Sequence, residues 1–144
     1  MDKDTARTGL EMSAKWFEYH AGQRQDMFKT FLIITAGLCS IIGYLLQAKL
    51  LPLLALSGLS LSTLAALFWK IDDRSRHLVG IGETAYQSFW SALGLPNEFC
   101  PPLQSAKKQP RMLRFKTLYR AAYLVCFITG VATTIVGVVL LTKA

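Results

Sequence analysis

The residues that could do chemistry in this chain are few and widely spaced. Its two histidines are His20 and His77, and its three cysteines are Cys39, Cys100 and Cys126. Metal sites normally draw on ligands in close pairs, and the sequence offers no such pair. It also lacks the glycine-rich loops that cradle nucleotide phosphates and a convincing Ser-His-Asp set. We therefore expect no enzymatic activity, no cofactor and no metal.

Three long uncharged stretches dominate the remainder of the chain. They cover residues 30–48, 50–69 and 121–142. At about 1.5 Å per residue, each is long enough to cross a hydrocarbon core of about 30 Å. A soluble bundle would need polar stripes that these stretches lack, so we predict one all-α membrane domain over residues 1–144 with three transmembrane helices. Lys49 alone separates the first two, which predicts a tight hairpin, with Pro52 in the first turn of the second helix.

The distribution of Lys and Arg predicts the orientation, because positive residues are retained on the cytoplasmic side. Of the 16 basic residues, only Lys49 and Lys143 lie beyond the far ends of the stretches. We therefore place the N-terminus inside and the C-terminus outside a bacterial inner membrane, as a multi-pass protein. The formal net charge of +7 then favours anionic lipid headgroups over direct nucleic-acid binding. The basic, proline-rich loop at 95–116 fits headgroup contact, although it could instead recruit a partner.

Two cytoplasmic helices are expected beside the first hairpin. The first covers residues 8–28, starting at a Thr8-x-x-Glu11 capping box, and the second covers 72–93, ending at Gly94 and Pro96. Because both would continue into neighbouring spans, we expect them to pack side by side and antiparallel. The candidate coupling residues on this helix pair are Trp16, His20, Arg24, Asp72, Asp73 and Glu83. His20 and Glu83 could form a buried titrating pair, or they could be ordinary solvated and structural residues.

Small residues are frequent within the spans, and such residues let helices approach closely in lipid. They could serve packing within one protomer. Three helices cannot enclose a pore alone, however, so we expect a homo-oligomer with a polar face turned to an axis. The two candidate faces are Ser57, Ser60 and Thr63 on the second span, and Thr129, Thr133 and Gly137 on the third.

Two segments carry a resemblance to a known group of proteins. The segment from Trp16 to Arg24 (WFEYHAGQR) precedes the hairpin, and the segment from Ile71 to Glu83 (IDDRSRHLVGIGE) follows it. Over roughly residues 12–90 this arrangement resembles small bacterial membrane proteins and the SLATT-type effectors, although the third span departs from the two-span pattern. The resemblance implies an oligomeric, pore-forming or membrane-perturbing effector of antiphage defence, with a cytoplasmic sensor protein as partner. The alternative is a non-conducting membrane anchor or scaffold for a cytoplasmic partner.

Overall fold

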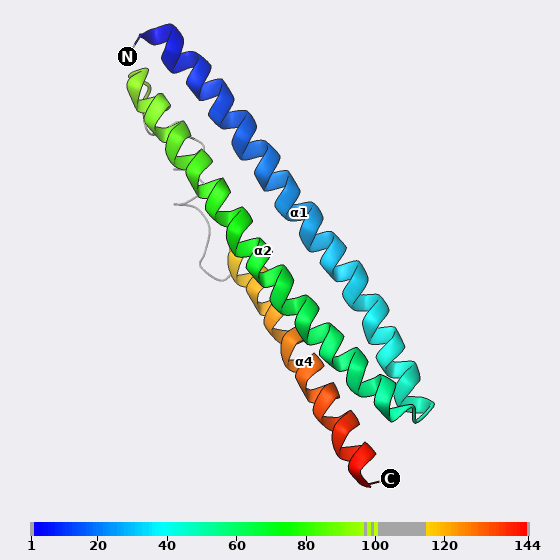
Figure 1. Ribbon diagram of the computed structural model, residues 1–144. Helices are drawn as coiled ribbons and strands as arrows, with labels where there is room; N and C mark the ends of the chain where they lie inside the picture. Colours follow the sequence, from blue (N-terminus) through cyan, green and yellow to red (C-terminus); the bar gives the residue numbers. More distant parts are fainter. Residues whose placement is uncertain (1, 97, 99, 101–114, 144) are drawn as a thin grey trace. The chain divides into compact units, whose positions relative to one another are not determined.

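The computed structural model describes residues 2–96, 98, 100 and 115–143, and this part of the chain is helical, with no strand. Its three long helices are α1 (Lys3–Gln47), α2 (Leu51–Ala92) and α4 (Phe115–Lys143), shown in Figure 1. Each is long and apolar enough to cross a membrane. The predicted all-α class is therefore confirmed for the described residues, and each of the three helices is a candidate membrane span.

Helix α1 begins earlier than the sequence suggested. It starts at Lys3, and the Ala6 amide donates to the Asp2 carbonyl at 3.0 Å, so Thr8 lies inside the helix and does not cap it. The capping-box assignment is wrong because residues 3–7 contain no glycine or proline to stop the helix from extending backward. Asp4 lies in the first turn, where its charge complements the helix dipole.

The turn between α1 and α2 is as tight as predicted. Lys49 adopts a left-handed conformation with φ of 55°, which is unusual for a residue with a side chain. The Leu50 amide donates to the Leu45 carbonyl at 3.1 Å, and the Lys49 amide donates to the Leu46 carbonyl at 3.4 Å. This is the Schellman arrangement, which satisfies two carbonyls at the end of α1. Helix α2 then starts at Leu51, so Pro52 does lie in its first turn.

The end of α2 has the same Schellman arrangement, with glycine at the left-handed position. Gly94 has a φ of 69°, its amide donates to the Ser91 carbonyl at 3.0 Å, and the Leu95 amide donates to the Trp90 carbonyl at 3.4 Å. The predicted stop at Gly94 is confirmed. Most of the expected loop at 95–116 lies outside the described residues, although α4 already starts at Phe115, before the predicted start of the third span at residue 121.

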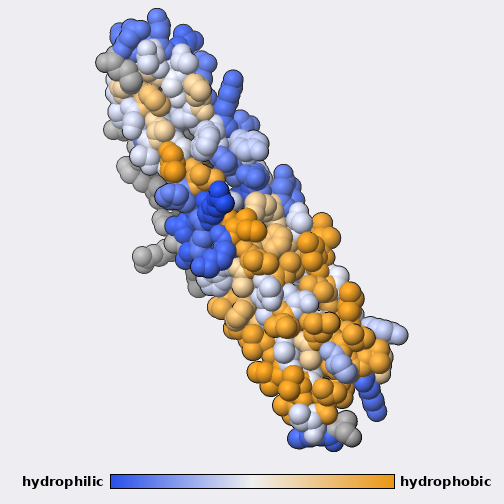
Figure 2. Space-filling model, viewed as in Figure 1, coloured by the Kyte–Doolittle hydropathy of each residue, from blue (hydrophilic) through white to orange (hydrophobic). Residues whose placement is uncertain are grey.

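The chain divides into two compact units, which we call the polar unit (Met1–Asp26 and Asp72–Arg114) and the apolar unit (Met27–Ile71 and Phe115–Ala144). All nine acidic residues of the sequence belong to the polar unit. The apolar unit contains basic residues but no carboxylate side chain. Figure 2 shows apolar side chains gathered over the surface of the apolar unit, whereas the polar unit is mostly hydrophilic. A surface of this kind suits contact with lipid better than contact with water.

An aromatic cluster forms the core at one end of the apolar unit. The rings of Phe28 and Tyr119 stack with centroids 3.9 Å apart, and Phe31 contacts both Phe68 and Tyr123. Phe31, Tyr119 and Tyr123 are buried. The cluster therefore ties the apolar part of α1 to both α2 and α4.

Candidate coupling site and small-residue helix interface

The two helices of the polar unit meet along a seam with coiled-coil spacing. On α2, one series of residues at alternating intervals of three and four is buried or half-buried throughout, namely Asp72, Ser75, Val79, Gly82, Tyr86 and Phe89. On α1, Ala6, Ser13 and His20 recur every seven residues and are all buried. Much of this seam is small or polar, so we expect it to be less stable than a seam of leucines and isoleucines.

Arg24 and Asp72 form the strongest polar contact of the seam. The guanidinium donates two hydrogen bonds to the carboxylate, from Nε at 2.5 Å and from an Nη atom at 3.1 Å. Only 15% of the Arg24 side chain and 5% of the Asp72 side chain remain exposed. The bidentate geometry fixes both side chains, and burial means that either charge would be costly to leave alone. The pair therefore sets the register of α1 against α2 in this unit.

Trp16 fits into a notch that Gly82 creates on α2. A Cβ atom at Gly82 would lie 2.9 Å from the indole Cδ1, so this position has little room for a side chain. The indole Nε1 donates to the Leu78 carbonyl at 3.2 Å. A second close approach lies nearer the start of α1, where a Cβ at Gly9 would overlap the ring of Phe89. These glycines let the two helices pack closely.

His20 is buried in the seam between two aromatic neighbours. Its ring centroid lies 4.4 Å from that of Trp16 and 5.1 Å from that of Tyr19, and its Nδ1 lies 3.3 Å from the Gln23 Oε1. Within the described residues, no hydrogen bond or ion pair joins His20 to Glu83, which is half-buried. The structure thus places the imidazole in an aromatic and amide setting.

The polar unit contains further ionisable and aromatic side chains beside these contacts. Asp73, the last of the candidate coupling residues, is half-buried and has a partner of its own. Tyr86 stacks on Trp90 with centroids 5.8 Å apart, and partial burial, together with the nearby Cys100 thiol, raises the pKa of the Tyr86 hydroxyl. Among the residues that the structure describes, no three His, Cys, Asp or Glu side chains gather in a way that could hold a metal ion.

In the apolar unit, α2 and α4 touch through glycines. A Cβ at Gly58 would lie 2.6 Å from the Thr134 amide nitrogen, and one at Gly130 would lie 2.7 Å from the Gly58 carbonyl oxygen. A Cβ at Gly137 would meet the backbone of Ala55 at 2.8 Å. These distances leave no space for side chains, so the two backbones approach as closely as in other small-residue helix pairs. The spacing of Gly130, Thr134 and Gly137 was the signal in the sequence that could have identified this interface.

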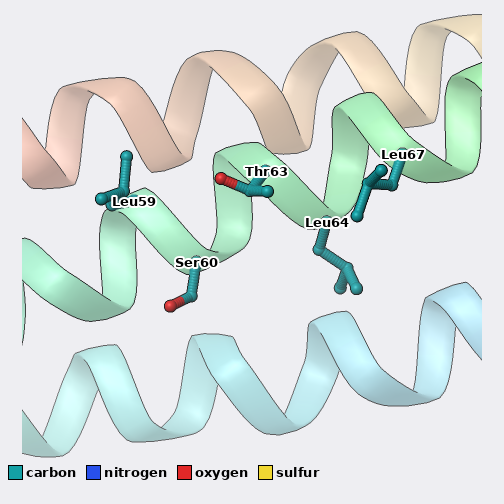
Figure 3. A pocket seen from close by; sticks show the side chains of 5 residues that line it. All are labelled: Leu59, Ser60, Thr63, Leu64 and Leu67. Carbon is teal, nitrogen blue, oxygen red and sulfur yellow. The ribbon is translucent and has the colours of Figure 1, made fainter.

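The two polar faces predicted for an oligomer axis are each divided by this packing. Ser57 and Gly137 are buried within the unit, whereas Ser60, Thr63 and Thr129 are exposed and Thr133 is half-buried. Figure 3 shows an open groove along α2, lined by Leu59, Ser60, Thr63, Leu64 and Leu67. The Ser60 hydroxyl donates to the Leu56 carbonyl and the Thr133 hydroxyl to the Thr129 carbonyl, each within its own helix. These hydroxyls therefore need no further partner in an apolar medium.

Comparison with known proteins gives one informative similarity. The chain is 36% identical over 75 residues to CD-NTase-associated protein 19 of Escherichia coli. The matched region is 51% of this chain and 50% of that protein, so the chain spans about half the length of the curated relative it matches. No protein family model matches the chain. No solved structure matches it either. The similarity thus links half of this chain to a protein named for its association with a CD-NTase.

Proposed function

We propose that this protein is a membrane effector of bacterial antiphage defence, which assembles as a homo-oligomer and permeabilises or depolarises the inner membrane without catalysing a reaction. The observation that carries the proposal is the combination of three long apolar helices with the similarity to a CD-NTase-associated protein. That similarity supports a role in antiphage defence. A protein working with a CD-NTase would have such an enzyme as its cytoplasmic partner.

The surface of the apolar unit supports the bilayer as its environment. The helical segments within this unit expose many large aliphatic side chains and carry no carboxylate side chain, and a water-soluble unit would be expected to aggregate through such a surface. The basic residues at its ends suit anionic headgroups. With N-terminus and polar unit in the cytoplasm, the partner would reach α1 and the second half of α2.

The polar unit supplies a means of control. Its seam combines a buried ion pair, a buried imidazole and glycine notches, so a partner that shifts α1 against α2 must break a small number of defined contacts. Both helices continue into the apolar unit, as α1 and α2 are each unbroken. Movement of the seam would then change the packing of the spans.

The function is tested by following membrane potential in cells that express the chain from an inducible promoter, alone and together with a CD-NTase. A potential-sensitive dye and uptake of propidium iodide report depolarisation and permeabilisation, and alkaline carbonate extraction reports membrane insertion. The proposal expects the protein to resist extraction and the potential to collapse when the CD-NTase is active. An extraction-resistant protein with the potential intact would overturn it and favour the alternative, a non-conducting anchor.

That alternative has one specific observation in its favour. The hydroxyls of Ser60, which is exposed, and of Thr133, which is half-buried, donate to carbonyls of their own helices, so neither is free to line a water-filled path. The same assay separates the two functions, because an anchor would recruit the CD-NTase to the membrane fraction without changing the potential.

A further inference from the structure

One exposed face of α1 carries side chains that do not match their expected surroundings, both in the polar unit and in the apolar unit. In the polar unit, Met12, Trp16 and Tyr19 are 68%, 46% and 67% exposed. The seam beside them buries polar side chains, such as Ser13 and His20. Water-exposed aromatic and sulfur-containing side chains on one flank, with polar residues inside, are the reverse of the usual distribution.

In the apolar unit, the same face of α1 is unusual because it exposes small residues. Gly37 and Ser40 are exposed, and nothing lies within 4 Å of the place where a Cβ at Gly37 would stand. Gly58, Gly130 and Gly137, by contrast, each accommodate a neighbouring helix. Exposed small residues in a lipid-facing helix are typical of contacts with another helix, because they let two backbones approach.

The two anomalies fall on one repeating pattern. Starting at Met12, intervals of four and three residues lead through Trp16, Tyr19, Gln23, Asp26, Thr30, Ile33, Gly37 and Ser40 to Tyr44, and every one of these positions is exposed. Intervals of this kind define the contact stripe of a coiled coil. Asp26 and Thr30 have partners within the chain and form a polar interruption of the stripe.

We propose that this stripe of α1 is the contact surface for the α1 helix of a second copy of the chain, running parallel to the first. The occupant must itself pass from water into lipid, which a soluble sensor cannot do and a second α1 does. Two copies in the same membrane share one orientation, so their α1 helices run parallel and identical residues meet. This inference deepens the proposed function and rests on it, since it names the contact through which the oligomer forms.

The exposed area is of the size that a dimer needs. Met12, Trp16 and Tyr19 together leave roughly 350 Å² uncovered, since side chains of this size present about 150–250 Å² each. Ile33 and Tyr44, which are 73% and 66% exposed, add roughly 250 Å². A standard interface buries about 800 Å² on each partner, so the stripe with its flanking atoms approaches that value.

The first test is cysteine cross-linking in membranes. The three native cysteines are replaced by alanine, and single cysteines are introduced as Ile33→Cys or Ile34→Cys. These neighbours are the same residue type, but only Ile33 lies on the stripe, whereas Ile34 is turned by about 100°. Oxidation is expected to give dimer in high yield for Ile33→Cys and little for Ile34→Cys. Equal yields, or more dimer from Ile34→Cys, would overturn the proposal.

The second test uses two exposed glycines with empty surroundings. Gly37→Leu should weaken oligomers in mild detergent by an order of magnitude or more, whereas Gly43→Leu, on a different side of α1, should leave them unchanged. If Gly37→Leu lowers membrane insertion, a second pair of variants replaces this pair. Tyr19→Lys, on the stripe, should then weaken assembly, whereas Glu18→Lys, beside the stripe, should not. Assembly insensitive to the stripe substitution would refute the contact. Stripe-specific cross-linking with no depolarisation would instead support the contact and count against the proposed effector function.

Discussion

The buried ion pair between Arg24 and Asp72 gives the sharpest test of how the polar unit is held together. Replacing Asp72 with alanine leaves a guanidinium that is 15% exposed without its carboxylate. Breaking one side of a buried pair costs about 3–5 kcal/mol. Arg24 has a further interaction in the chain, so we place the cost at the lower end, about 3 kcal/mol. A loss of that size multiplies the open population of the seam roughly a hundredfold.

Hydrogen exchange of the full-length protein in detergent micelles measures this loss directly. In Asp72→Ala, amides of α2 between Ser75 and Tyr86 should exchange about a hundred times faster, or as fast as unprotected amides if the seam is less stable than that. Amides of the apolar unit should keep their protection. The matched control is Glu11→Ala, because the Arg7–Glu11 pair is 3.9 Å apart and largely exposed, and such pairs contribute about 0–1 kcal/mol.

A double substitution separates the cost of an unpaired charge from the value of the pair itself. Arg24→Met with Asp72→Leu removes both charges and retains most of the volume, so its exchange should be close to that of the wild type or slower. If Asp72→Ala exchanges like the wild type, or if the double variant is as labile as the single one, the electrostatic reasoning about this seam is wrong.

Three further predictions concern the backbone. Lys49→Gly should stabilise the helical hairpin against thermal unfolding by about 1 kcal/mol relative to Lys49→Ala, because both variants remove the charge and only glycine adopts positive φ freely; equal melting temperatures would contradict this. Gly82→Ala should destabilise the polar unit by about 1–3 kcal/mol through overpacking, as measured by hydrogen exchange. Gly80→Ala has open space around it, so the same measurement should find this variant neutral or stabilised. Gly130→Ala should separate α2 from α4, measured as a loss of cross-linking between cysteines placed at their ends, since its Cβ would lie 2.5 Å from the Ser62 hydroxyl oxygen.

The sequence by itself determined the elements that depend on local chemistry. Long runs without charge specify helices that are apolar all round, Gly94 supplies positive φ at the end of α2, and the single residue Lys49 between two runs leaves room only for a tight turn. It also indicated that the helical segments at 8–28 and 72–93 would pack side by side, since both continue into neighbouring helices of one hairpin. The start of α1 was misjudged because a capping pattern is only a local preference, and nothing upstream of Thr8 opposed helix.

Only the tertiary structure decided which side of each helix is used, because several sides of an apolar helix look equivalent in sequence. It assigned Gly58, Gly130 and Gly137 to contacts within the chain and left Gly37 unoccupied, although all four are glycines in apolar runs. It also buried His20 in the seam between α1 and α2 of the polar unit, a choice that depends on the rotation of α1 about its axis. That rotation is set by the sum of contacts with the neighbouring helix, such as the notch at Gly82 and the pairing with Asp72, and no single local pattern encodes it.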